Sequence, residues 1–160
     1  MLILNCGGTF NKRYNVVDGT LEVPYDNRAI DTILKSTYGV YNIAGIVYKD
    51  SLDMTSEDRK MIANIILESN DDSFIIVHGT DTMHLTAKFL SEIFDNKKVV
   101  LTGAMKPFEI DNIEATLNLG IAIGFLNAKP DNGVYIAMNG LISSCNSIEK
   151  NREEGKFELV

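Results

Sequence analysis

Five short runs of apolar, mostly β-branched residues stand out along the chain. They are Leu2 to Leu4, Ile43 to Tyr48, Phe74 to Val77, Val99 to Leu101 and Val134 to Met138. Most of these runs are continuous rather than alternating with polar residues, which is typical of strands that are buried on both faces. The pattern therefore predicts a parallel central sheet.

Helical patterns lie between the predicted strands. Apolar residues of Ser56 to Glu68 share one face, and Thr55 with Asp58 resembles a capping box at its start. Residues Asp81 to Phe94 repeat apolar side chains every three or four positions, and Asp26 to Leu34 is a weaker helical candidate. We expect a well-specified start for the Ser56 to Glu68 helix, and packing of the apolar stripe of Asp81 to Phe94 on the sheet.

Two further segments complete the pattern. A third helix is predicted to begin near Asp111, with Glu114 at the capping-box position. Its body, Ile113 to Leu126, is apolar on almost every side, which predicts a deeply covered helix. Residues Phe10 to Val23, with Asp18-Gly19 in the middle, indicate a mobile hairpin or loop.

The alternation of strands and helices predicts an α/β fold with a single doubly wound, mostly parallel sheet and helices on both faces, of the flavodoxin-like or Rossmann-like kind. No repeat, low-complexity tract or linker divides the 160 residues. We therefore expect residues 1–160 to form one domain.

Composition and charge narrow the range of ligands. With 45% hydrophobic and 23% charged residues the chain resembles an ordinary globular protein. Its formal net charge of −7 argues against a nonspecific grip on nucleic acid or on an anionic membrane, because both require a basic patch. Small polar ligands fit better.

The two cysteines and the first residues indicate the compartment. Cys6 and Cys145 lack the CxxC spacing, so neither a disulfide framework nor a zinc site is expected. The apolar start is only a few residues long and has no basic leader, which fits neither a signal peptide nor a membrane span. We expect a cytoplasmic protein.

Polar and glycine residues follow four of the predicted strands. The segments are Gly7-Gly8-Thr9, Asp50-Ser51, His78-Gly79-Thr80-Asp81 and Gly103-Ala104-Met105-Lys106. Because the carboxyl ends of parallel strands converge on one crevice, we expect the four segments to line one site. They offer two threonines, a serine and a carboxylate without metal-ligand spacing, which favours a hydroxyl nucleophile activated by a nearby base, either Tyr14 or a lysine.

Four short motifs at these strand ends resemble those of the bacterial L-asparaginase family. They are GGTF at 7–10, DSLDMT at 50–55, HGTDTM at 78–83 and TGAMKP at 102–107, in the same order and at similar separations. The resemblance spans nearly the whole chain. It implies hydrolysis of L-asparagine or a related small amide to the acid and ammonia, with neither cofactor nor metal.

The resemblance also implies catalytic roles. Thr9 matches the nucleophile, and Tyr14 the lid tyrosine that bonds its hydroxyl, although the intervening loop is short here. Thr80 matches the threonine that orients the attacking water, and Lys150 the lysine of a triad with Thr80 and Asp81. Desolvation would lower the pKa of this lysine and Asp81 would raise it, and the sequence leaves the direction open.

Substrate binding is implied for a second set of positions. Ser51 matches the serine that holds the α-carboxylate, and Asp81 the carboxylate that pairs with the α-amino group. Gly79 and Thr80 belong to the same binding turn, and the backbone carbonyl of Ala104 matches the group that receives the scissile amide N–H.

Each of these residues also fits an ordinary structural role when taken alone. The threonines would suit turns or helix caps, and Asp81 the first turn of a helix. Lys150 lies in the charged run IEKNREEGK, which is typical of a solvated face. We expect a structural, hydrogen-bonded His78 and a surface His84, with no catalytic role for either.

The sequence departs from the family in two ways. Full-length members carry a second, smaller C-terminal domain, and this sequence ends about where their first domain ends. Leu52 replaces a side chain that is polar in many members. Because the family's site forms between subunits, we expect a homo-oligomer, a dimer or a tetramer, that acts on a small amino-acid amide.

Three alternatives to an independent amidohydrolase remain open. A binding module without turnover would recognise aspartate or asparagine through Ser51, Thr80 and Asp81. The ammonia-producing part of a tRNA-dependent amidotransferase is a second alternative, although no RNA-binding feature supports it. A flavodoxin-type phosphate-binding protein is disfavoured because neither GxGxxG nor GxxxxGK[ST] occurs.

Overall fold

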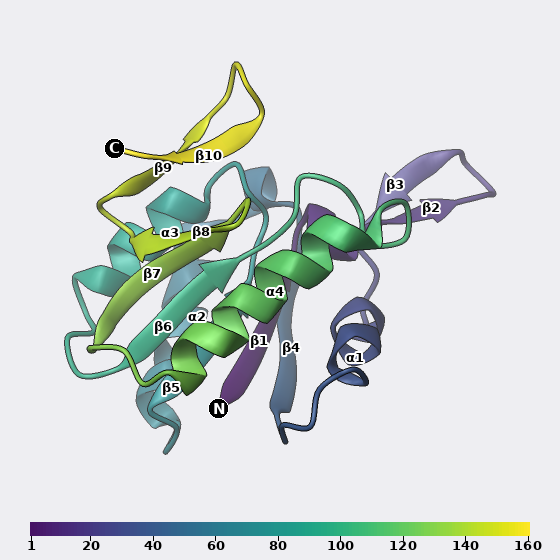
Figure 1. Cartoon of the computed structure of the whole chain (residues 1–160). Coiled ribbons are helices and arrows are strands. Elements are labelled where there is room, and N and C mark those ends of the chain that lie inside the picture. Colours follow the sequence, from purple (N-terminus) through teal and green to yellow (C-terminus); the bar gives the residue numbers. More distant parts are fainter.

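A six-stranded sheet forms the centre of the molecule in a computed structural model that describes all 160 residues (Figure 1). Its strand order is β4-β1-β5-β6-β7-β8. The strands are β1 (Leu2–Gly7), β4 (Asn42–Lys49), β5 (Ser73–Val77), β6 (Lys98–Thr102), β7 (Gly133–Met138) and β8 (Leu141–Ser144). All neighbours are parallel except β7 and β8, so the predicted sheet is confirmed and gains an antiparallel edge strand.

Helices cover both faces of this sheet, which confirms the doubly wound prediction. They are α1 (Arg28–Leu34), α2 (Ser56–Glu68), α3 (Met83–Ser91) and α4 (Asn112–Asn127). One buried cluster joins α2 and α3 to the sheet, and a second joins α1 and α4 to its other face (Figure 1). Short 3-10 turns, η1 (Thr9–Asn11) and η2 (Ser51–Asp53), follow β1 and β4.

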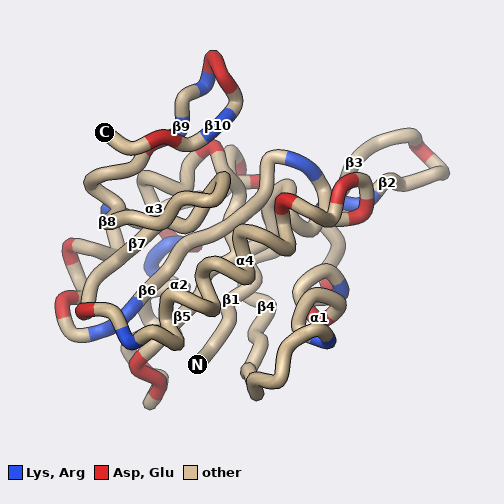
Figure 2. Tube along the Cα trace, viewed as in Figure 1, with Lys and Arg blue, Asp and Glu red and all other residues tan.

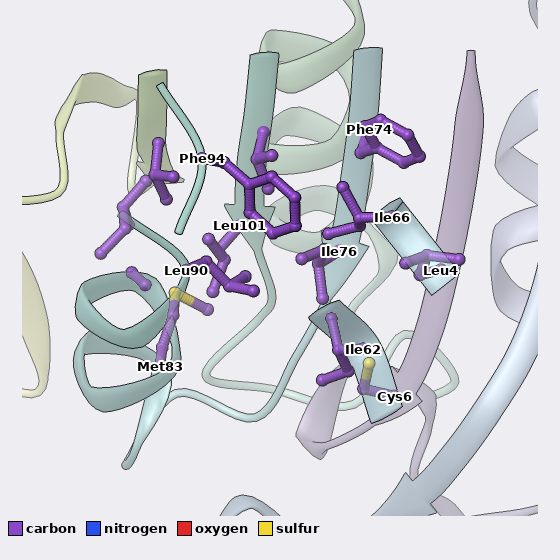
Figure 3. Close-up of a cluster of buried hydrophobic side chains, with 14 of the residues drawn as sticks. Leu4, Cys6, Ile62, Ile66, Phe74, Ile76, Met83, Leu90, Phe94 and Leu101 are labelled. Carbon is purple, nitrogen blue, oxygen red and sulfur yellow. The ribbon is translucent and has the colours of Figure 1, made fainter. Parts of the chain in front are cut away.

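Burial on both faces explains why the strand sequences do not alternate. On β1, Leu4 packs into the α2–α3 cluster and Ile3 into the α1–α4 cluster. On β5, Ile76 and Ile75 divide in the same way, and all four side chains are fully buried. Figure 3 shows Leu4 and Ile76 beside the α2 side chains Ile62 and Ile66. A continuous apolar run therefore supplies side chains to the cores on both faces of the sheet.

The starts of α2 and α3 differ in how well the sequence predicts them. The capping box of α2 is confirmed: Thr55 Oγ1 accepts from the Asp58 N–H at 3.2 Å, and Asp58 accepts from the Thr55 N–H at 2.8 Å. Helix α3 begins at Met83, two residues later than predicted. Thr82 precedes it and donates its hydroxyl to the Ser51 carbonyl at 2.7 Å, which holds the preceding turn out of the helix.

Helix α4 begins where the sequence predicts, but two expectations about it are wrong. Glu114 does not close a capping box; its carboxylate accepts from the N–H groups of Met105 and Lys106 at 3.0 and 3.2 Å. The helix is covered on one face only, since Ile113 is 74% exposed and Leu117 half exposed. An apolar pattern on every side predicts burial all round, whereas nothing in the chain covers the outer face of this helix.

Two hairpins lie outside the central sheet. The predicted hairpin within 10–23 is confirmed as β2 (Arg13–Asn15) paired with β3 (Thr20–Glu22). The second hairpin, β9 (Ile148–Asn151) with β10 (Lys156–Leu159), occupies the run whose charges are typical of a solvated face. Ile148 and Phe157 anchor it, because both are buried in the α2–α3 cluster.

Replacing Ile76 with alanine tests the packing of the α2–α3 core. The side chain is fully buried, so Ile76→Ala should lower the free energy of unfolding by about 2–5 kcal/mol. The matched control is Leu67→Ala on the exposed face of α2, where a change within about 0.5 kcal/mol is expected. Urea unfolding followed by circular dichroism measures both, and equal losses would contradict the assignment of these two faces.

Candidate active site

The carboxyl ends of β1 and β5 form a topological switch point. The chain leaves β1 to form β4 on one side of it and later returns as β5 on the other side. In open α/β sheets ligands bind outside the strand ends at such a point. Thr9 follows β1 and Thr80 follows β5, so two of the predicted residues flank the switch point.

Close approach of three turns fixes the shape of this crevice. Gly8 has a positive φ of 73°, and a Cβ there would lie 2.4 Å from both Cα and N of Gly79. A Cβ on Gly79 would lie 2.6 Å from Cβ of Ser51 and 2.7 Å from its Oγ. Any side chain at either glycine would force the turns apart. The turns after β1, β4 and β5 therefore pack directly on one another.

The structure brings Lys150 to Thr80 and Asp81. The lysine Nζ lies 2.9 Å from Thr80 Oγ1 and 2.7 Å from Asp81 Oδ1, although about 70 positions separate them in sequence. Side-chain exposure is 11% for Lys150 and 33% for Asp81. On β9 the lysine points the same way as the buried Ile148, because side chains alternate along a strand. The triad implied by the resemblance is thus assembled.

Arg152 is a neighbour of Asp81 that the sequence reasoning missed. Its guanidinium lies 3.4 Å from Asp81 Oδ1 and donates to the Asp81 carbonyl at 3.0 Å. The available signal was that Arg152 lies two positions after Lys150. This spacing puts both side chains on the same face only where the chain is extended, which the sequence alone did not show. Asp81 therefore faces two cations, of which the exposed Arg152 is the one free to move away.

Ser51 and its neighbours form the adjoining wall of the crevice. The buried Ser51 Oγ accepts from the Asp81 N–H at 3.2 Å, which joins the β4 and β5 turns. Asp50 pairs with Lys12 at 2.5 Å and accepts from the Leu52 N–H. Partial burial alone would raise the pKa of Asp50, but these hydrogen bonds outweigh it and hold the pKa below its usual range. The Leu52 side chain is exposed and takes no part in this network.

His78 is a structural residue, as predicted. Its ring is fully buried, with Nδ1 2.7 Å from the Gly79 carbonyl and Nε2 2.9 Å from Thr86 Oγ1. Thr86 already accepts from Arg59, so its hydroxyl proton is free for Nε2 and the neutral ring carries its proton on Nδ1. Burial lowers the pKa of His78 to about 4, which keeps it uncharged. His84 is exposed, as expected.

The remaining predicted groups, Thr9, Tyr14 and the Ala104 carbonyl, form no hydrogen bond with the triad. Thr9 and Tyr14 have no hydrogen-bond partner for their hydroxyl groups within the chain, and Tyr14 points toward Gly19 of its own hairpin. The Tyr14 N–H instead donates to Glu109 at 3.0 Å. Ala104 is buried in the turn after β6, and no donor of the chain bonds to its carbonyl oxygen.

Comparison with known families agrees with this geometry. The family model described as "Asparaginase, N-terminal" matches residues 1–156. The chain belongs to the asparaginase family. The similarity suggested by the four strand-end motifs is thereby confirmed, and this asparaginase-family chain corresponds to the N-terminal part of the family's proteins.

Curated relatives of this asparaginase-family chain carry two kinds of name. A probable periplasmic L-asparaginase of Haemophilus influenzae is 35% identical over 132 residues, which cover 76% of the chain and 38% of that protein. A glutamyl-tRNA(Gln) amidotransferase subunit of Methanococcus maripaludis is 31% identical over 147 residues, covering 86% and 34%. The chain thus spans little more than a third of these relatives.

Solved structures of asparaginases share the fold. The thermostable L-asparaginase of Thermococcus kodakarensis matches with a TM-score of 0.86 and 27% identity, over 99% of this chain and 50% of that one. A probable cytoplasmic L-asparaginase of Campylobacter jejuni matches with a TM-score of 0.77 and 29% identity, over 99% and 52%. The asparaginase-family fold therefore accounts for all of this chain and for half of theirs.

The buried, neutral His78 predicts how stability depends on pH. An unfolded histidine binds its proton near pH 6.5, but folded His78 binds it only near pH 4. Its contribution is therefore complete above pH 6.5 and is lost as the pH falls toward 4, by up to about 3 kcal/mol. Urea unfolding at several pH values should show a steeper acid loss for the wild type than for His78→Gln. The exposed His84→Gln is the control, and a slope unchanged in both variants would contradict the assignment.

Proposed function

We propose that this chain is the catalytic domain, residues 1–160, of an amidohydrolase that converts L-asparagine or a related small amide to the acid and ammonia. The observation that carries the proposal is the contact of Lys150 Nζ with Thr80 Oγ1 and Asp81 Oδ1. A lysine whose side chain is only 11% exposed and that donates to a threonine hydroxyl at a strand-end crevice suits the positioning of that hydroxyl for catalysis better than fold stability.

The proposed reaction has two steps. Thr9 Oγ attacks the side-chain amide carbon, the C–N bond breaks and ammonia leaves, so the acyl group remains on Thr9 as an ester. Water oriented by Thr80 then attacks the ester carbon and releases the acid. In this scheme the Thr9 proton passes through the Tyr14 hydroxyl to the leaving nitrogen, and one proton of the water returns through Thr80 to Thr9 Oγ as the ester C–O bond breaks. The Lys150 ammonium holds the Thr80 hydroxyl and the Asp81 carboxylate in position. Because no hydrogen bond joins the Thr9 and Tyr14 hydroxyl groups in this structure, and Tyr14 lies near Gly19 of its own hairpin, the scheme requires the β2–β3 hairpin to bring the two hydroxyl groups together before the first step.

Substrate recognition is proposed to involve both walls of the crevice. Ser51 holds the α-carboxylate and Asp81 the α-ammonium, within the turn that contains Gly79 and Thr80. The Ala104 carbonyl, which has no donor in the chain, receives the scissile amide N–H. Arg152 occupies one side of Asp81 and must swing away, or contribute to the carboxylate, when an ammonium enters.

Removing the nucleophile tests the proposal most directly. Ammonia release from millimolar L-asparagine should vanish in Thr9→Ala, because no other hydroxyl replaces it, and should be unchanged in Ser36→Ala in the exposed turn after α1. A glutamate dehydrogenase-coupled assay measures the ammonia, with aspartate quantified in parallel. Equal turnover by Thr9→Ala and the wild type would refute the threonine mechanism.

The same assay tests the contact of Lys150 with Thr80 and Asp81. Lys150→Met should lower kcat/KM about tenfold to a hundredfold or more, since the charge-assisted hydrogen bonds of Lys150 to Thr80 and Asp81 are both lost. Lys156→Met is the matched control, because Lys156 pairs only with the exposed Glu154 of the same hairpin. An equal loss in the control would show that the hairpin, rather than the Lys150 contact, is responsible.

A homo-oligomer, dimer or tetramer, is proposed as the working form. Support comes from the family and from the outer face of α4, where Ile113 and Leu117 are exposed and, after Glu114 in the first turn, the helix carries no charged residue (Figure 2). Light scattering should give a mass above that of one 17.7 kDa chain, and Leu117→Glu should reduce it to the monomer. Leu67→Glu, exposed on α2, is the control. A monomeric wild type would refute the proposed homo-oligomer.

The compartment and partners follow from the same proposal. None of the helices has both the length and the apolar character needed to cross a membrane. The family includes relatives named as periplasmic and as cytoplasmic, and we propose the cytoplasm because the chain carries two free cysteines. No nucleic-acid partner and no cofactor are proposed.

A second candidate is the ammonia-producing part of an amidotransferase. The Methanococcus relatives named as glutamyl-tRNA(Gln) amidotransferase subunits favour it. Ammonia release by the purified chain alone would favour an independent amidohydrolase. Release that requires an added acceptor complex would favour the amidotransferase, and saturable aspartate binding without release in either case would indicate a binding module.

A further inference from the structure

Two side chains from the first two turns of α4 hold the turn that follows β6. Helix α4 begins at the carboxyl edge of the sheet (Figure 1). Glu114 accepts from the N–H groups of Met105 and Lys106 at 3.0 and 3.2 Å, with one carboxylate oxygen for each. Asn118 lies one helical turn later, is fully buried, and donates from Nδ2 to the Gly103 carbonyl at 2.9 Å. The turn is therefore fixed from α4.

These contacts fix both peptide units of Ala104. The Gly103 carbonyl belongs to the unit before Ala104, and the Met105 N–H to the unit after it. No peptide bond of the chain is cis, and in a planar trans unit the carbonyl and the N–H point in opposite directions. The Ala104 carbonyl therefore points away from the Glu114 carboxylate, and rotation of this unit would break the Met105 hydrogen bond.

The carboxylate also changes the charge on the Ala104 carbonyl oxygen. A negative group that accepts from a peptide N–H polarises the whole unit, so the carbonyl of that unit becomes a stronger acceptor. Ala104 is buried, and no donor of the chain bonds to its carbonyl oxygen. An acceptor that is strengthened by Glu114 and left unused by the chain suits an external donor.

Helix α4 does not need Glu114 for its own start. Asp111 already caps the helix, since its Oδ1 accepts from the Ile113 N–H at 3.2 Å. A glutamate in the capping-box position bonds the backbone of its own N-cap residue, whereas both oxygens of Glu114 bond the turn after β6. The Asn139 side-chain amide, 3.4 Å from Glu114 Oε1, helps to keep the carboxylate in place. The contact with the turn is thus distinct from helix capping.

We propose that Glu114 is a positioning residue for the scissile amide, because it orients and polarises the Ala104 carbonyl. This inference rests on the proposed function, in which that carbonyl receives the amide N–H of the substrate. The leaving nitrogen gains a proton and positive charge as the C–N bond breaks, so its hydrogen bond to the carbonyl strengthens during the first step. Glu114 therefore acts on asparagine binding and on kcat without touching the substrate.

Binding of L-asparagine and of L-aspartate separates this role from a purely structural one. In the Thr9→Ala chain, which the proposed mechanism leaves unable to consume asparagine, NMR titration is followed at the Thr80 amide. Adding Glu114→Ala should weaken asparagine binding about threefold to tenfold, and Glu114→Gln should weaken it less, because one acceptor oxygen remains. Aspartate binding should not weaken, because the side-chain carboxylate has no N–H to donate to the carbonyl.

Glu57→Gln is the matched control. Glu57 also lies in the first turn of a helix, α2, but it pairs only with the exposed Lys60. It should leave both affinities unchanged. With Thr9 restored, kcat for L-asparagine should fall about threefold to tenfold in Glu114→Ala and not in Glu57→Gln. Hydrogen exchange at the Met105 and Lys106 amides should be faster in Glu114→Ala than in the wild type.

Three results would overturn the inference. They are an equal loss of asparagine and aspartate binding in Glu114→Ala, unchanged asparagine binding in that variant, and unchanged hydrogen exchange at the two amides. The first result would show that Glu114 only supports the shape of the crevice. If the Thr9→Ala chain binds asparagine but the wild type releases no ammonia, hydrolysis fails as the function, and a selective loss of asparagine binding still supports the inference. If the chain binds neither ligand, both fail.

Discussion

The contact between backbone turns at the carboxyl edge of the sheet is the constraint on which the site depends. Gly8 meets Gly79, and Gly79 meets Ser51, at separations that leave no room for a Cβ atom. Residues that follow three different strands are thus held against one another by backbone rather than by long side chains. Such a contact is stiff, because backbone atoms cannot change rotamer, and stiffness is what a positioned hydroxyl requires.

The Lys150 contact lies at the same edge of the sheet, but the lysine comes from a separate hairpin. Its hairpin lies outside the central sheet and is held by Ile148 and Phe157, which are buried in the core. A lysine so little exposed is tolerated because Asp81 and Thr80 satisfy it at hydrogen-bond distance. Apolar anchoring therefore fixes where the hairpin lies, and the polar partners fix where the lysine points.

Much of the fold was predictable from sequence, and what was missed has physical reasons. Five parallel strands were found because burial on both faces leaves continuous apolar runs. The strands β8, β9 and β10 were missed, since each is four residues long with at least two polar residues, and only tertiary contacts make it a strand. The coverage of α4 was wrong because an all-apolar helix does not reveal which face has a neighbour. At the site the strand-end rule found the crevice, but Arg152 is recognisable only once β9 is in place.

The β2–β3 hairpin carries the candidate base Tyr14, whose hydroxyl is not hydrogen-bonded to that of the candidate nucleophile Thr9 in this structure. The hairpin is joined to the body through the Lys12–Asp50 and Arg13–Asp26 pairs and the Tyr14–Glu109 hydrogen bond, and the apolar residues at its tip face solvent. Pairs that are partly open to water contribute about 0–1 kcal/mol each, so breaking them costs little. The turns beneath are fixed by backbone contact and the segment above is held weakly. Rigid turns beneath a weakly held hairpin favour a site that is completed when the hairpin moves.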